Sequence, residues 1–237
     1  MEKNKKDIGR TIKVNGRMNL NKSFKISIGI FVILITLISL MFVAYGYEDG
    51  QKNILKEGVG FNNFRVFNNA GEYIFDVPEG VDRVMVEVWG GGGSGYYDDL
   101  NDKYYLGGGG SYGKIIYSVD SDGEYLVRVG NGGNYGDYID GRGGTSGFGD
   151  LNEWIVKAKG GDSGIKSSKG GTASYLGRSS DFFEMDGMEG FGFCAGDGAN
   201  GGAGQCFDLN GKLSKSLAPG GGSVEGKGAE GRVVIWW

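Results

Sequence analysis

The glycine content limits how this chain can fold more than any other feature. The chain has 50 glycines and only 2 prolines among 237 residues. Collagen is excluded, because its triple helix needs glycine at every third position together with abundant proline. Many of the glycines stand in short runs: Gly90–Gly93, Gly107–Gly110, Gly132–Gly133, Gly143–Gly144, Gly160–Gly161, Gly170–Gly171, Gly201–Gly202 and Gly220–Gly222. Because glycine inside a helix costs about 1 kcal/mol relative to alanine, these segments are not expected to be helical.

Strand-like segments separate the glycine runs. Glu72–Val77 alternates apolar and polar residues, as a half-buried strand does, and Val84–Trp89 is apolar on both faces except at Glu87, as in a central strand. Similar patterns predict strands at Phe64–Phe67, Gly113–Val119, Tyr125–Val129, Glu153–Ala158 and Arg232–Trp237. The sequence DSDG at residues 120–123 predicts a hairpin between the two strands beside it. The chain after Tyr47 is therefore predicted to be all-β.

The glycine runs themselves allow two interpretations. They are flexible linkers, or they are extended rods like polyproline II that pack backbone against backbone and hydrogen-bond to one another. The runs recur throughout the chain and are bracketed by strands or aromatic residues, whereas a linker would gather them in one place. We favour the packed rods.

A fixed order of motifs runs through residues 66–237. Ala70–Gly95 (AGEYIFDVPEGVDRVMVEVWGGGGSG) contains a strand, a VPEGV turn, a second strand and a polyglycine run. Later motifs are GGGGSYGK (Gly107–Lys114), DGEYLVRVGNGG (Asp122–Gly133), GGTSGFG (Gly143–Gly149), VKAKGG (Val156–Gly161) and the closing GRVVIWW. This series resembles the glycine-rich domain of bacterial and phage proteins. The resemblance implies a glycine-rich β-sandwich of the kind carried by surface or secreted proteins and phage tail-tip adhesins. The insert 96–106 and the stretch 178–194 depart from the pattern.

The N-terminal region has the pattern of a membrane anchor. Residues 1–25 are basic, and Ile26–Tyr47 contains no charged residue. As a helix that run spans about 33 Å, enough for a hydrocarbon core of roughly 30 Å. The positive-inside rule then places residues 1–25 in the cytoplasm and the acidic remainder outside the membrane.

We therefore predict a signal anchor at 26–47, a connector at 48–65 and a glycine-rich β domain at 66–237. Three alternatives remain for the apolar run. A cleaved signal peptide is compatible with Ala44–Gly46, although the run is longer than a usual signal core. A pilin-like leader and a buried helix of a soluble protein fit less well.

Histidine is absent from the sequence, which limits the possible chemistry. Triads with histidine, histidine-ligated zinc and histidine-held haem are excluded. Acid–base catalysis by a carboxylate pair remains open, but Asp98 and Asp99 are adjacent in a loop, a poor arrangement for opposed carboxylates. Loop aspartates such as Asp137 and Asp140 could hold Ca²⁺ weakly. We predict no cofactor, no metal, no nucleic-acid partner and no enzymatic activity.

Cys194 and Cys206 flank the glycine-rich stretch AGDGANGGAGQ. Outside the membrane an oxidised pair is permitted, and closing such a loop stabilises a fold by about 3 kcal/mol in the chain-entropy model. A disulfide is favoured over two free thiols.

Aromatic residues gather in two places. Tyrosines lie in segments rich in glycine, serine, asparagine and aspartate: Tyr96, Tyr97, Tyr104, Tyr105, Tyr112, Tyr135 and Tyr138. This is the composition of binding loops, and such rings suit contact with a sugar or a protein, although they would also serve to cover the glycine rods. The apolar set Phe182, Phe183, Met185, Met188, Phe191 and Phe193 is expected to form a small satellite of the core.

The function we expect is that of a membrane-anchored, extracytoplasmic surface module, structural or adhesive and without catalysis. Its partners would be the bilayer, through residues 26–47, and a surface glycan or protein. A subunit of a surface filament or envelope complex is the alternative, and a histidine-free hydrolase is a weaker one.

Overall fold

The structure is a computed structural model that describes residues 60–134, 141–150, 152–165, 167–176 and 181–237. The chain divides into two compact units, Met1–Gly58 and Val59–Trp237, and the described residues belong to the second. The predicted anchor at 26–47, Tyr135 and Tyr138 lie outside them. Across these ranges there is no helix with the length and apolar character needed to span a bilayer.

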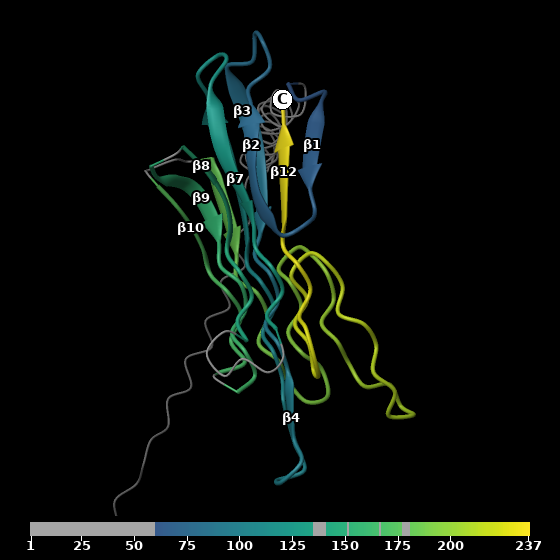
Figure 1. Ribbon diagram of the computed structural model, residues 1–237. Coiled ribbons are helices and arrows are strands. Elements are labelled where there is room, and N and C mark those ends of the chain that lie inside the picture. The colour runs from purple at the N-terminus through teal and green to yellow at the C-terminus, as the bar shows by residue number, and fades with distance from the viewer. Residues whose placement is uncertain (1–59, 135–140, 151, 166, 177–180) are drawn as a thin grey trace, which may run out of the picture. The chain divides into compact units, whose positions relative to one another are not determined.

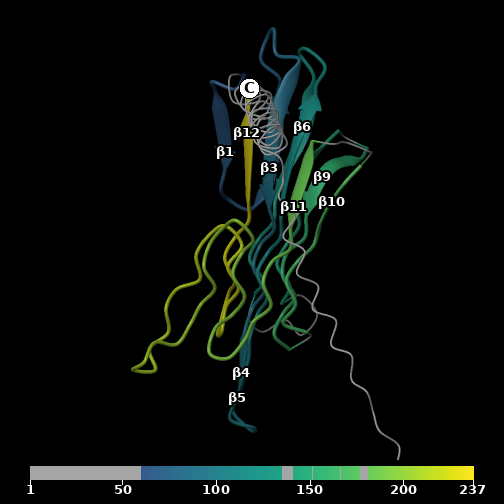
Figure 2. The same cartoon turned by 180° about the vertical axis from the view of Figure 1, so that it is seen from behind.

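The described part is built from antiparallel strands (Figures 1 and 2). One five-stranded sheet has the order β1-β12-β3-β6-β11, a second has the order β10-β9-β8-β7-β2, and β4 pairs with β5 alone. The strands are β1 (Phe64–Phe67), β2 (Gly71–Asp76), β3 (Arg83–Trp89), β4 (Tyr96–Asp98), β5 (Lys103–Tyr105), β6 (Tyr112–Ser118), β7 (Glu124–Val129), β8 (Ser146–Gly149), β9 (Trp154–Ala158), β10 (Ala173–Tyr175), β11 (Phe182–Met185) and β12 (Arg232–Trp236).

The two large sheets pack face to face around one apolar core. On β3 the inward residues Val84, Val86 and Val88 are fully buried, while Phe75 of β2 and Phe148 of β8 meet them from the other sheet. The all-β sandwich is thus confirmed for this part of the chain. All seven predicted strands are present, with boundaries within about one residue.

The hairpin predicted at residues 120–123 is wrong, although the turn itself is there. Gly123 N donates to Asp120 O at 3.0 Å. The strands on either side diverge, because β6 pairs with β3 and β11 whereas β7 pairs with β2 and β8 in the other sheet. The turn therefore carries the chain across the sandwich.

The glycine runs continue from the ends of the strands as a bundle of extended segments, below the sheets in Figure 1. Two runs lie at its centre, Gly90–Gly93 and Gly107–Gly110, and both are buried. Their backbones hydrogen-bond to segments far away in the sequence. Gly91 N donates to Gly144 O at 2.9 Å and Gly92 N donates to Ala229 O at 2.8 Å.

The hydrogen bonds repeat every third residue. Gly93 N donates to Gly108 O of the second run at 2.8 Å, and Gly90 N donates at 2.9 Å to the oxygen of Ser111, the residue that follows this run. In the same way, Gly107 N and Gly110 N donate to Ser223 O and Gly220 O. A polyproline II helix has three residues per turn and no internal hydrogen bonds, so its amides point to a new neighbour at each residue. The packed rods predicted from the sequence are therefore confirmed.

Close approach is the reason that these positions are glycine. None of the residues Gly90–Gly93 has a positive φ, so backbone conformation does not require glycine there. A Cβ at Gly92 would lie 2.0 Å from Gly221 O, and one at Gly109 would lie 1.8 Å from Asp197 O. The rods are packed at a spacing that leaves no room for a side chain.

Candidate binding surface at the glycine-rich end

Four of the seven tyrosines assigned to binding loops lie together on the hairpin of β4 and β5. Tyr96 pairs with Tyr105 and Tyr97 with Tyr104 in its register. The rings of Tyr97 and Tyr104 lie 4.5 Å apart between centroids, and Lys103 Nζ lies 4.6 Å from the centre of the Tyr105 ring. This hairpin projects from the glycine end, away from the large sheets (Figure 1). Tyr104 is exposed on it, and the other three tyrosines are half-buried.

Aspartates hold the turn of this hairpin. Asp98 Oδ1 accepts a hydrogen bond from Leu100 N at 3.0 Å, and its Oδ2 accepts one from the Asn101 amide at 2.7 Å. The Asn101 hydrogen bond lowers the pKa of Asp98. Tyr97 donates its hydroxyl to Asp102 at 2.7 Å, and this bond raises the pKa of Tyr97 to about 12. The turn is fixed by its own side chains, and Asp98 serves a structural purpose there.

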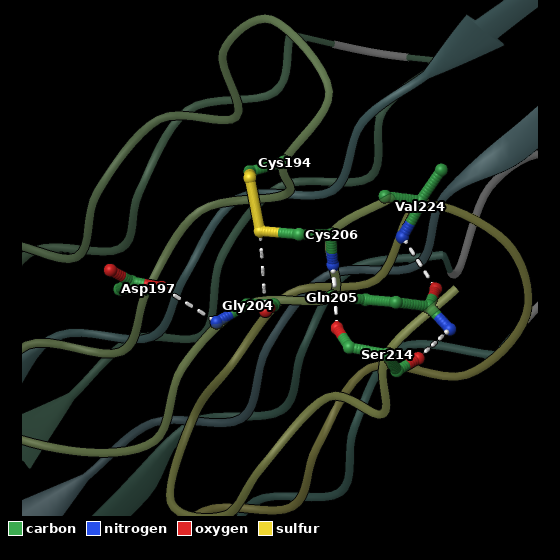
Figure 3. The surroundings of a disulfide bond; sticks show 7 residues. All are labelled: Cys194, Asp197, Gly204, Gln205, Cys206, Ser214 and Val224. Carbon is green, nitrogen blue, oxygen red and sulfur yellow. Dashed lines mark hydrogen bonds between the residues drawn. A yellow bond between two sulfur atoms is a disulfide. The ribbon is translucent and has the colours of Figure 1, made fainter. Parts of the chain in front are cut away.

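A disulfide holds the neighbouring loops. Cys194 is bonded to Cys206 (Figure 3). Next to this bond, Phe207 N donates to Phe193 O at 3.1 Å. The side chain of Gln205 continues the connection, because its amide group donates to Ser214 O at 2.9 Å while its Oε1 accepts from Val224 N at 2.9 Å. Loops that carry little apolar core of their own are thus tied together covalently and through the Gln205 amide.

These loops expose aromatic residues that sequence reasoning assigned to a core satellite. Phe191 is 88% exposed and Phe193 is 77% exposed, and Met188 also faces solvent. Of the six residues in that set, Phe182 packs against the core, and the Phe183 ring lies 6.1 Å from the ring of the buried Tyr112. The prediction failed because the disulfide-linked loops are anchored through backbone groups, which leaves their apolar side chains outside.

The tyrosine hairpin and the disulfide-linked loops touch each other. The Tyr104 ring lies edge-on to the Phe207 ring, with 4.9 Å between centroids. The sequence analysis did not select Phe207 as a site residue. Its position next to Cys206 was the one feature of the sequence that could have indicated it. Tyr112, in contrast, is buried in β6 against Trp89 and donates to Glu87 Oε1 at 2.7 Å, so its assignment to a binding loop is wrong. We call the surface formed by residues 96–105, 191–194 and 206–213 the aromatic tip.

Other hollows of the described part offer less chemistry. A cleft of about 540 Å³ lies at the edge of β2, but Glu72 on its wall is already bonded to Arg128, whose guanidinium lies 5.0 Å from the centre of the Trp154 ring. Within the described ranges, histidine, cysteine, aspartate and glutamate form no group of three that could hold a metal ion. The aromatic tip is therefore the better candidate site.

The order of strands and glycine rods matches a known family. The family model described as the glycine-rich domain matches residues 68–234, which is most of the chain. The chain belongs to the glycine-rich domain family. Among curated proteins there is no match. In this glycine-rich domain the sandwich and the rods form the framework, and the aromatic tip projects from the end of the rods.

Proposed function

We propose that this glycine-rich domain is a non-catalytic binding or adhesion module, held outside the cell by an uncleaved membrane helix at residues 26–47. The observation that carries the proposal is the aromatic tip. Its exposed rings stand on loops that are fixed by a disulfide, by side-chain amides and by the glycine rods. Large exposed apolar groups on a folded domain mark interaction surfaces.

Rigidity supports binding in this arrangement. A surface made of mobile loops loses side-chain and backbone entropy when it binds, about 0.5–1.5 kcal/mol for each immobilised side chain. The Tyr97 hydroxyl bond to Asp102 and the contact of Tyr104 with Phe207 fix those rings before any partner arrives. Tyrosine adds a large amphipathic contact at low entropic cost.

The experiment has two steps. Protease treatment of intact cells should release peptides from residues 48–237 and none from residues 1–25. Cells that carry Tyr104→Ala with Phe193→Ala should then adhere less than wild-type cells. Ile74→Ala is the matched control, because Ile74 is an exposed apolar residue of β2, on the outer face of the sandwich.

Two results would overturn the proposal: full protection of residues 48–237 from external protease, or adhesion that is equal in the tip variant and the control. Crosslinking in the native membrane distinguishes the filament alternative, which requires one dominant partner protein.

A further inference from the structure

Two turns of the aromatic tip have the same short sequence. Asp99–Lys103 reads DLNDK and Asp208–Lys212 reads DLNGK. In both, the leucine stands at the end of the turn, with Leu100 95% exposed and Leu209 fully exposed. In both, the fourth residue adopts a left-handed conformation, with φ of 49° at Asp102 and 73° at Gly211. The aromatic tip thus carries two turns of similar sequence, each with an exposed leucine, although the capping aspartate lies two residues before Leu100 and one residue before Leu209.

Several backbone amides of these turns donate to groups within the turns. Asp98 accepts from Leu100 N at 3.0 Å and its carbonyl accepts from Asn101 N at 3.3 Å. Asp208 Oδ1 accepts from Asn210 N and from Lys212 N, both at 2.8 Å, and its carbonyl accepts from Gly211 N at 3.0 Å. The amides that are bonded in this way lose no hydrogen bond with water when the turns leave it.

A third turn has the same property with phenylalanine. Phe191 and Cys194 exchange backbone hydrogen bonds of 2.9 Å and 3.1 Å, with Gly192 at φ 63° between them. This pairing leaves the Phe191 and Phe193 side chains outside, and the disulfide ties them to the segment that carries Leu209. Three closed turns from separate segments thus present apolar side chains.

We propose that these three turns insert into the surface of a phospholipid bilayer. The inference rests on the proposed function, because it names the partner of the aromatic tip. A bilayer offers no hydrogen bonds below its headgroups, so a segment that enters it must satisfy its own backbone. The turns meet part of that requirement, through bonded amides such as those of Leu100, Asn210 and Phe191.

The arrangement fits a lipid better than a protein pocket. The apolar side chains stand on separate tips, as suits a fluid medium that closes around each of them. Behind the tips lie Tyr97, Tyr104 and Tyr105, and tyrosine is enriched at the headgroup level of membranes. Lys103 and Lys212 each follow an exposed leucine by three residues, within reach of phosphate groups.

The charge of the tips favours a zwitterionic surface. Asp99 and Asp102 flank Leu100, and Asp208 precedes Leu209, so the carboxylates near the tips outnumber the two lysines. Anionic lipids would repel them. The apolar side chains then provide the binding energy, in contrast to a basic peripheral helix that binds by charge.

The test uses residues 48–237, which contain a compact unit with its own core, and vesicles of phosphatidylcholine. We expect the domain to sediment with the vesicles, and Leu100→Ser with Leu209→Ser to weaken the partition coefficient by about tenfold for each leucine. Leu176→Ser is the matched control, because Leu176 is 52% exposed and lies beside Ile155, at the end of β9 far from the rods. Equal denaturation midpoints will show that the variants are folded.

Three outcomes would overturn the lipid proposal: no sedimentation of the wild type, equal binding of the double variant, or binding that needs anionic lipid and disappears at high salt. If the domain ignores vesicles but still binds whole cells through the aromatic tip, the partner is a surface glycan or protein. The lipid proposal then fails while the proposed function stands.

Discussion

Substitution of Gly92 by alanine tests whether the glycine rods are truly close-packed. The new Cβ would lie 2.0 Å from Gly221 O and 2.4 Å from Gly221 C, and both are backbone atoms with no freedom to turn aside. Non-bonded carbon atoms are comfortable at about 3.5–4.0 Å. The two rods must therefore separate by more than an ångström.

Separation also affects the hydrogen bonds of the same residue. Gly92 N donates to Ala229 O, and Gly92 O accepts from Gly133 N, each at 2.8 Å. Overpacking alone costs about 1–3 kcal/mol, and a buried backbone group that loses its partner costs about 1–3 kcal/mol more. We expect Gly92→Ala to lower the free energy of unfolding by about 3–5 kcal/mol, a large part of the 5–15 kcal/mol typical of a domain.

Urea unfolding of residues 48–237, followed by tryptophan fluorescence, measures this loss. Two alanine substitutions serve as controls. A Cβ at Gly113 would meet only side chains, the nearest being Val156 Cγ2 at 3.3 Å, and one at Gly60 would meet nothing within 4 Å. We expect about 1 kcal/mol for the first and almost no change for the second. If Gly92→Ala lowers the free energy of unfolding no more than Gly113→Ala does, the rods can separate at little cost and the packing argument is refuted.

Three further predictions concern exchange, ionisation and the disulfide. The amides of Gly107–Gly110 should exchange with deuterium as slowly as those of strand β3, because each donates to a neighbouring rod; exchange as fast as in a free peptide would contradict this. Burial, and then the bond to Glu87, raise the pKa of Tyr112, so its neutral form is favoured in the folded state. The stabilisation from this shift should therefore be fully present below pH ~10 and be lost as the pH rises above it. In an absorbance titration, Glu87→Gln should let Tyr112 ionise at a lower pH. An unchanged titration would count against the contact. Replacement of Cys194 and Cys206 by serine opens a loop of sequence separation 12. It should lower the free energy of unfolding in urea by about 3 kcal/mol and expose the chain to proteolysis between residues 191 and 213. An unchanged urea midpoint would show that the loop is held by its hydrogen bonds.

The sequence predicted those strands whose side chains alternate or form β-branched runs. It missed the strands that carry no such pattern. In β8, of sequence SGFG, only Phe148 has an apolar side chain, and Gly147 is required because the Trp154 ring lies where its Cβ would be. Such a strand is specified by its neighbours, and a local pattern cannot reveal it.

The failed hairpin shows a second limit. The DSDG turn reverses the chain as its residues require, with Asp122 at φ 62°. Turn chemistry does not decide which strands pair beyond the turn. Val77 N donates to Gly123 O and Val119 N donates to Asp82 O, which extends the pairs β2–β7 and β3–β6 instead. Pairing was decided by burial of two apolar faces, a property of the whole sandwich.

The candidate site was predicted in part. The tyrosines of the hairpin were visible from composition, because two pairs of them bracket a polar segment in residues 96–105, although the hairpin itself was not predicted. The exposure of Phe191 and Phe193 was not, because an apolar residue is normally assigned to a core. Their exposure follows from anchoring through a disulfide and backbone bonds, which a one-dimensional pattern does not display.

The framework and the aromatic tip depend on different parts of the sequence, and this separation has a consequence for how the domain can change. The rods are joined backbone to backbone, so their stability requires glycine but does not depend on the exposed side chains at the ends of the loops. Residues 96–106 connect two central rods directly, and the bridge between Gly95 and Gly226 closes the bundle before the hairpin begins. Substitution of the exposed Leu100 should therefore leave the free energy of unfolding unchanged, whereas adding even a methyl group at Gly92 should lower it strongly. A surface built in this way can acquire new contacts without loss of fold.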